Sequence, residues 1–94
     1  MSLQASTYIE GDSRQLYAWL NEALETVRND FPQILSFRVH LVDADEVSVT
    51  LELKTSSFAE ADNVAEHVID RVTEIGATRS SGQFHTGQTE LLPA

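Results

Sequence analysis

The chain contains no cysteine among its 94 residues. This absence excludes a disulfide scaffold, thiol catalysis and every zinc site that is built on cysteine. Long hydrophobic runs are missing as well, because His40 interrupts the most apolar stretch, residues 39–42, whereas a membrane span needs about 20 apolar residues. We therefore expect no membrane partner. Since no charged-then-apolar leader opens the sequence, we also expect a cytoplasmic protein.

Basic side chains are scarce: six Lys and Arg stand against fifteen Asp and Glu, which gives a net charge of −9. A nucleic-acid backbone repels such a surface, because binding there depends on Lys and Arg that displace condensed counterions. We therefore expect no nucleic-acid partner. Hydrophobic residues make up 41% and charged residues 22% of the chain, which is typical of a globular protein. The length predicts a single domain over residues 1–94.

Two helices are predicted by apolar residues that recur every three or four positions. Asp12 can cap the first helix, and Pro32 ends it. Ser57 and Glu60 have the spacing of a capping box at the start of the second helix, and Gly76 can cap its end. The apolar stripe of the first helix is Leu16, Leu20, Ala23, Val27 and Phe31, and that of the second is Ala61, Val64, Ala65, Val68, Val72 and Ile75.

Three strands are predicted by alternation of apolar and polar residues, over residues 3–10, 35–41 and 47–53. Residues 35, 37, 39 and 41 form the apolar set of the second strand. The acidic segment 43–46 turns the chain between the second and third strands. These two strands therefore form an antiparallel hairpin with one apolar and one polar face.

The register of this hairpin is restricted by parity. Because the apolar residues of both strands must share one face, the numbers of facing residues add up to 88 or 90. At 90, Arg38 lies opposite Glu52 and His40 lies opposite Thr50; at 88, Arg38 lies opposite Thr50. We favour 90, because it places opposite charges across from each other.

The C-terminal segment is polar, and Gly82 and Gly87 interrupt it. Glycine weakens the interior of a strand. We therefore predict an edge strand near residues 78–86, with residues 87–94 as a tail. The alternative is a small terminal hairpin that turns near Gly87.

The predicted order is strand, helix, strand, strand, helix, strand. Packing both helix stripes on one face of the sheet gives an α+β domain with the ferredoxin-like βαββαβ order and a four-stranded antiparallel sheet. The order of elements in residues 3–76 is similar to that of ribosome-hibernation factors, a likeness of topology only. Those proteins carry basic residues where this chain is acidic, so no site residue is carried over. The fold hosts many unrelated functions and by itself predicts none.

The face of the sheet that the helices leave open is the candidate ligand-binding surface. It is expected to present Arg38, His40, Thr50 and Glu52. A catalytic interpretation makes His40 the general base, with Glu52 or Arg38 holding its ring in place. No nucleophile elbow, phosphate loop or cofactor fingerprint accompanies these residues in the sequence. We therefore assign no catalytic residue and no cofactor.

Four carboxylates, which we call the acidic row, are spaced four residues apart on the second helix: Asp62, Glu66, Asp70 and Glu74. Each pair of like charges at this spacing costs about 0.2–0.5 kcal/mol. The row is interpreted either as a solvated outer face or as a docking stripe for a basic protein partner. It is not expected to hold a metal ion, because its side chains spread along the helix instead of converging.

The three histidines and the single tryptophan are candidates for a metal site or an interface. The histidines His40, His67 and His85 are expected on separate parts of the surface, so no metal site is predicted. Trp19 lies slightly off the first apolar stripe, which predicts a partly buried residue at the rim of the core or an interface anchor.

Three functional hypotheses remain. The first is a non-catalytic acidic interaction or assembly domain that forms a homodimer, because the sheet has an open face and unpaired edges. The alternative is a sensor domain that binds a small ligand on the open face. The third is a small enzyme that uses His40 as general base.

Overall fold

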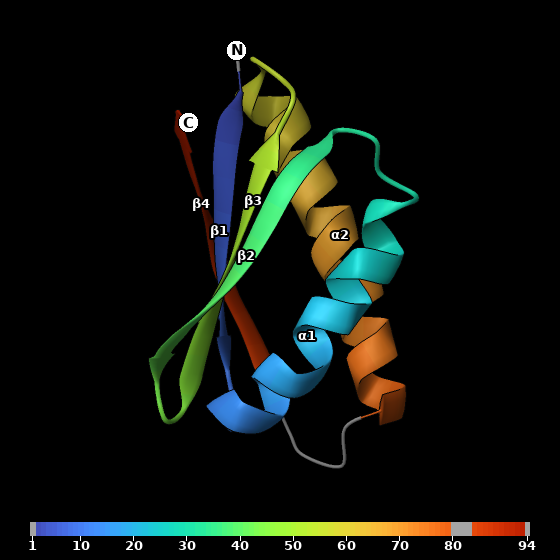
Figure 1. The fold of residues 1–94 in the computed structure, drawn as a ribbon. Helices are drawn as coiled ribbons and strands as arrows, with labels where there is room; N and C mark the ends of the chain where they lie inside the picture. Colours follow the sequence, from blue (N-terminus) through green and yellow to red (C-terminus); the bar gives the residue numbers. More distant parts are fainter. Residues whose placement is uncertain (1, 80–83, 94) are drawn as a thin grey trace.

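The computed structural model describes residues 2–79 and 84–93. Its elements are β1 (Leu3–Glu10), α1 (Ser13–Arg28), β2 (Ile34–Asp43), β3 (Glu46–Leu53), α2 (Phe58–Arg79) and β4 (His85–Pro93). Two helices and four strands follow one another in this order along the described chain (Figure 1).

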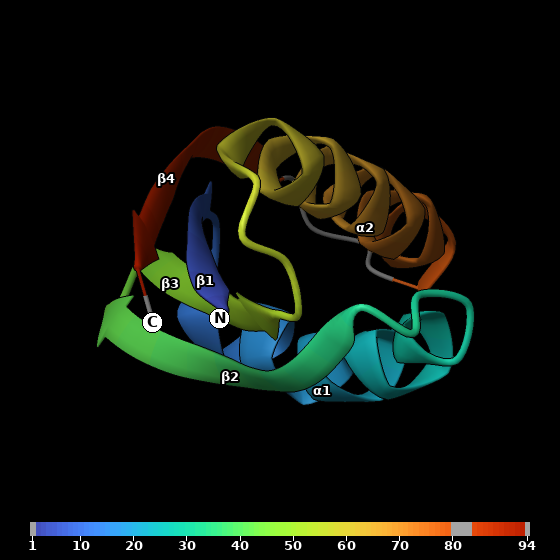
Figure 2. The ribbon, with the colours of Figure 1, turned by 90° about the horizontal axis from the view of Figure 1, so that it is seen from above.

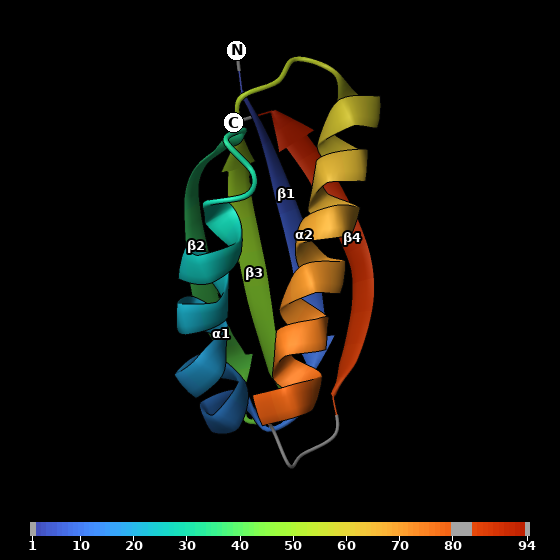
Figure 3. The same cartoon turned by 90° about the vertical axis from the view of Figure 1, so that its right-hand side faces the viewer.

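The strands form one antiparallel sheet in the order β2-β3-β1-β4. Both helices cover the same face: α1 lies over the β2 side of the sheet and α2 over the β4 side (Figures 2 and 3). The other face carries no helix. This is the ferredoxin-like arrangement, so the predicted fold class is confirmed.

Helix α1 begins where its capping residue predicts. The Asp12 carboxylate accepts hydrogen bonds from the backbone N–H groups of Arg14 and Gln15, both at 3.1 Å. These bonds satisfy two donors that have no partner within the helix. The helix ends at Arg28, and Phe31 lies beyond it but still packs against the core.

Helix α2 is longer than predicted. Its start is confirmed, because the Ser57 hydroxyl accepts a hydrogen bond from the Glu60 N–H at 3.2 Å. Its predicted end at Gly76 is wrong, since the helix continues to Arg79. Glycine is needed at position 76 for another reason: a Cβ added there would lie 2.7 Å from Cζ2 and 2.9 Å from Cζ3 of Trp19. The indole ring of Trp19 rests directly on the backbone of α2.

Trp19 is therefore a core residue, and its prediction as a rim residue or interface anchor is wrong. Its side chain is 7% exposed. The ring centroids of Trp19 and Phe84 are 5.4 Å apart, with 52° between the ring planes. The missing side chain at Gly76 lets the indole sink between the two helices, which the spacing of apolar residues along α1 does not reveal.

The register of β2 and β3 corresponds to the sum of 88, so the favoured value of 90 is wrong. Arg38 lies opposite Thr50, and Glu52 lies opposite Ser36. The physical reason is a bulge at Val42, which takes up one residue and lets residues 44–45 close the hairpin as a short turn. Without this bulge, a hairpin whose facing residues add up to 88 would need a longer loop between its strands.

Strand β4 lies later in the sequence than predicted. The expected strand near 78–86 is wrong, because α2 occupies residues up to 79 and the strand covers His85–Pro93, where a tail was expected. Residues 80–83 of that expected strand lie outside the described residues. The inward positions of β4 include threonine: the hydroxyls of Thr7 and Thr89 share a hydrogen bond of 2.6 Å on the inner face. Because polar residues lie on that face, the sequence of β4 does not show the alternation of apolar and polar residues that predicts a strand.

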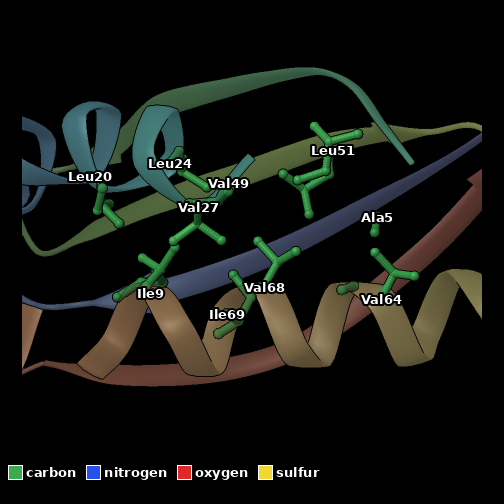
Figure 4. Packing of buried hydrophobic residues seen from close by; sticks show 14 of the residues in the cluster. Ala5, Ile9, Leu20, Leu24, Val27, Val49, Leu51, Val64, Val68 and Ile69 are labelled. Carbon is green, nitrogen blue, oxygen red and sulfur yellow. The ribbon is translucent and has the colours of Figure 1, made fainter. Parts of the chain in front are cut away.

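The hydrophobic core fills the space between the sheet and the two helices (Figure 4). Side chains from both helices and from β1 and β3 meet there, as their apolar stripes predict. On β2 one inward residue differs from the prediction, because Ile34 is buried and Leu35 is 45% exposed. A second bulge in β2, at Leu35, causes this exchange.

Candidate functional site

The four predicted ligand-binding residues all lie on the open face of the sheet. Arg38 and His40 belong to the edge strand β2, and Thr50 and Glu52 belong to β3. The structure brings Arg38 and Thr50 together as facing residues, and it places His40 opposite Ser48. The expected facing pairs, Arg38 with Glu52 and His40 with Thr50, are not formed, because the bulge at Val42 sets the other register.

Two of these side chains already have hydrogen-bond partners. The Thr50 hydroxyl shares a hydrogen bond of 3.0 Å with the Ser6 hydroxyl on β1. The Glu52 carboxylate accepts a hydrogen bond of 3.4 Å from the Ser2 hydroxyl. Neither group is therefore aimed at His40, and the expected orienting role of Glu52 has no geometric support.

An open concavity of about 420 Å³ lies at the turn end of the β2–β3 hairpin. Its described lining is Glu10, Gly11, Asp43, Asp45, Glu46 and His85. Strand pairing brings these residues together, because Glu10 lies opposite both Glu46 and His85. A backbone hydrogen bond from the Gly11 N–H to the Asp45 carbonyl, 2.9 Å long, joins the hairpin turn to the end of β1.

Sequence reasoning did not find this acidic concavity. The acidic segment 43–46 was interpreted only as a turn, and only the β1–β4 pairing connects it through Glu10 to His85. The carboxylates favour a cationic group over an anion. However, in residues 2–79 and 84–93 no group of three or more His, Asp or Glu side chains is arranged to hold a metal ion.

A second concavity, of about 490 Å³, lies between the start of α1 and β2. Its described lining is Asp12, Ser13, Arg14, Leu41, Asp43 and Ala44. Neither concavity is lined by any of the four predicted ligand-binding residues. These two concavities therefore lie away from the predicted ligand site.

The acidic row on α2 is exposed at all four positions, as predicted. Arg71, which could have offset the charge of Glu74, instead forms an ion pair of 3.1 Å with Asp30 at the end of α1. Within the described part of the chain, no residue of the row takes part in an ion pair. None of the four carboxylates is therefore held by an ion partner of its own.

Neutralising the acidic row by Asp62→Asn, Glu66→Gln, Asp70→Asn and Glu74→Gln should raise the free energy of unfolding by about 1 kcal/mol at low salt, because three repulsive pairs disappear. The gain should shrink at high salt, where screening already weakens the repulsion. Urea unfolding at two salt concentrations measures both effects. Glu60→Gln is the control: Glu60 lies in the first turn of α2, where a negative charge is favourable, so its removal should lower stability slightly. An unchanged or lowered stability of the fourfold variant contradicts the prediction.

Exposed aliphatic side chains gather on the edge strand β2, and we call this strand with its uncovered backbone edge the β2 edge. Leu35 is 45%, Val42 47% and Leu41 56% exposed. A basic residue packs against the same strand: the Arg28 guanidinium carbon lies 5.6 Å from the centroid of the Phe37 ring. The β2 edge is thus more apolar than the composition of the chain suggests, and its residues 36–41 contain no acidic side chain.

Among residues 2–79 and 84–93, neither helix has the length and hydrophobicity that crossing a membrane requires.

Comparison with known proteins shows the fold and nothing finer. No family model and no curated protein matches the chain. Among solved structures, a hydantoinase/carbamoylase family amidase from Burkholderia ambifaria matches with a TM-score of 0.59 at 16% identity, over 95% of this chain and 27% of the amidase. The chain thus spans about a quarter of that enzyme.

Two further structures match over nearly their whole length. The de novo designed protein Foldit4 has a TM-score of 0.54 at 14% identity, over 96% of this chain and 97% of the design. A conserved protein of unknown function from Bacteroides thetaiotaomicron, described as a possible oxidoreductase, has a TM-score of 0.52 at 7% identity, over 97% of both chains. At these identities the likeness is one of fold, which unrelated functions share.

Proposed function

We propose that the chain is a non-catalytic interaction domain that works as a homodimer in the cytoplasm. The observation that carries the proposal is the β2 edge, where Leu35, Leu41 and Val42 are exposed on a strand with one unpaired side. An unpaired strand edge is a template for pairing with another chain. Apolar side chains on it favour a partner that removes them from water.

Two other hypotheses have less support. A small-ligand sensor would use Arg38, His40, Thr50 and Glu52, but Thr50 and Glu52 already have hydrogen-bond partners, and neither of the two concavities described above borders the four residues. An enzyme with His40 as general base needs a group that orients the imidazole. His40 is exposed and faces Ser48 in the register.

The acidic row supplies the second part of the proposal, a surface for a basic protein partner. Its four carboxylates are exposed on α2. In the sheet order, β2 and the α1 side lie at one edge, and α2 lies on the β4 side (Figure 3). A homodimer formed through β2 would therefore leave both acidic rows free to bind a basic surface.

Native mass spectrometry of the purified protein tests the homodimer, and we expect the mass of two chains. Each chain carries a net charge of −9, so the two copies repel each other. Raising the salt concentration from about 50 to 500 mM should therefore strengthen association several-fold, because salt screens this repulsion. Sedimentation over a dilution series measures the change. A monomer at every protein and salt concentration contradicts the proposal.

A further inference from the structure

We infer that β2 pairs antiparallel with β2 of a second copy, about a twofold axis that passes through Val39. This inference rests on the proposed homodimer and specifies its interface. The two four-stranded sheets would join into one continuous sheet. The axis follows from the bulges and the parity of the strand.

The two bulges limit the part of β2 that can pair regularly. They lie at Leu35 and Val42, so the uninterrupted stretch is residues 36–41. Directly facing residues of an antiparallel pair point to the same side of the sheet. When the two copies keep their helices on one side, the numbers of facing residues must therefore add up to an even number. Within this stretch, the longest pairing that sets every apolar residue opposite another apolar residue joins residues 37–41 of one copy to residues 37–41 of the other. This pairing places Val39 on the twofold axis.

This register matches apolar residues on the helix side of the joined sheet. Phe37 would face the partner's Leu41, and Val39 would face the partner's Val39. Phe37 and Val39 are only partly buried within one copy, and Leu41 is 56% exposed. Pairing would cover all three in each copy. Aromatic–aliphatic pairs across strands are among those that stabilise a sheet.

The stretch of β2 that would pair, residues 36–41, contains no acidic side chain in an otherwise acidic protein. Three of the six basic residues of the chain lie on or against β2. Arg38 belongs to the strand, and Arg28 covers Phe37 while forming an ion pair of 3.6 Å with Glu25. Arg14 lines the same hollow as Leu41, together with Asp12 and Asp43. Two chains of net charge −9 repel each other least where the contacting segment carries no carboxylate.

The opposite edge of the sheet is blunted. Strand β4 has a register shift beside Gly87, and Pro93 stands at its end. The longest part of β4 without a register shift is residues 89–93, which ends at the proline, whereas β2 offers residues 36–41 without a proline. Proline cannot donate the backbone hydrogen bond that strand pairing needs. The two edges also offer a matched pair of exposed leucines, Leu41 on β2 at 56% and Leu92 on β4 at 53% exposure.

The first test compares Leu41→Asp with Leu92→Asp by native mass spectrometry. We expect Leu41→Asp to raise the dimer dissociation constant at least tenfold, because each carboxylate would face the partner's Phe37. Leu92→Asp adds the same charge at the other edge and should leave the dimer in place. Circular dichroism should show a folded protein for both, since both leucines are exposed. Equal effects of the two variants would overturn the inference.

The second test fixes the register by strengthening the contact. In the inferred register Arg38 faces the partner's His40, so His40→Glu creates two Arg–Glu pairs across the interface. The dissociation constant should fall about three- to tenfold, although the variant makes the chain more acidic. Gln88→Glu, which adds a charge to an exposed position on β4, should not tighten the dimer. If the axis passed through residue 40 instead, the two glutamates would meet and His40→Glu would weaken association.

The two proposals fail in different ways. A wild-type monomer overturns the homodimer itself. A wild-type dimer that survives Leu41→Asp, or that His40→Glu loosens, keeps the homodimer and overturns the β2 interface. A monomer that instead binds a strand of another protein at β2 overturns both the homodimer and the inferred occupant of the edge.

Discussion

Replacing Gly76 with alanine should lower the free energy of unfolding by about 1–3 kcal/mol. In an ordinary helix interior the same change has the opposite sign and gains about 1 kcal/mol, because alanine restricts the unfolded chain and favours the helix. Here the new Cβ would lie 2.7 and 2.9 Å from two indole carbons of Trp19, and the ring is buried against Phe84. The steric cost therefore exceeds the gain in helix propensity.

A double-mutant cycle isolates this contact. In a Trp19→Leu background the alanine at position 76 should be neutral or stabilising, because the smaller side chain leaves room for the Cβ. The protein contains a single tryptophan, so its fluorescence reports on this site alone. Displacement of the indole by Gly76→Ala should shift the emission to the red. Urea unfolding measures the stability of all four proteins at one protein concentration, since dimerisation makes apparent stability depend on concentration. A Gly76→Ala variant more stable than wild type would contradict the packing.

The elements that the sequence predicts well are those in which local chemistry and burial agree. Asp12 caps α1 because a short acidic side chain before an apolar stripe satisfies free N–H groups. Gly76 shows the opposite case. Near the end of an apolar stripe, glycine usually marks a helix end, but here a side chain on the other helix requires it. The contact between residues 19 and 76 joins two different helices, so the local sequence around either residue does not predict it.

Strand β4 was misplaced for a related reason. Its inward position at Thr89 is polar, and the partner that makes this acceptable is Thr7 on β1, 82 residues away in sequence. The alternation that identifies a half-buried strand assumes apolar inward residues. A buried hydroxyl that is hydrogen-bonded to another hydroxyl has little cost of desolvation, so the strand forms without the expected signal.

The sequence predicted which residues share the candidate site, but it did not predict which of them face each other. Parity places Arg38, His40, Thr50 and Glu52 on one face, and the structure agrees. The choice between two registers depended on one ion pair across the strands, which is worth less than about 1 kcal/mol. A bulge at Val42 outweighs so small a preference. The acidic concavity has no sequence signal, because its residues come from all four strands and from the turns between them.

Leu51 should be among the most sensitive positions of the core. It is 1% exposed, and its facing residue on β1 is Ala5, also 1% exposed (Figure 4). Leu51→Ala would place two alanines opposite each other, and the rigid sheet on either side cannot close the space. We therefore expect a loss of about 3–5 kcal/mol, the upper part of the range for such truncations. Leu92→Ala, at an exposed leucine on β4, should cost well under 1 kcal/mol.

A larger side chain on the facing strand can fill the space that Leu51→Ala leaves empty. This change tests whether the cavity, and not the identity of residue 51, causes the loss of stability. Ala5→Leu alone should destabilise by about 1–3 kcal/mol through overpacking. Combined with Leu51→Ala, it should recover at least half of the stability lost by Leu51→Ala, because facing side chains occupy neighbouring space on the same side of the sheet. Urea midpoints at one protein concentration measure all three variants. If the double variant is as unstable as the sum of the single variants, residues 5 and 51 do not share one space, and the β1–β3 register is wrong at this point.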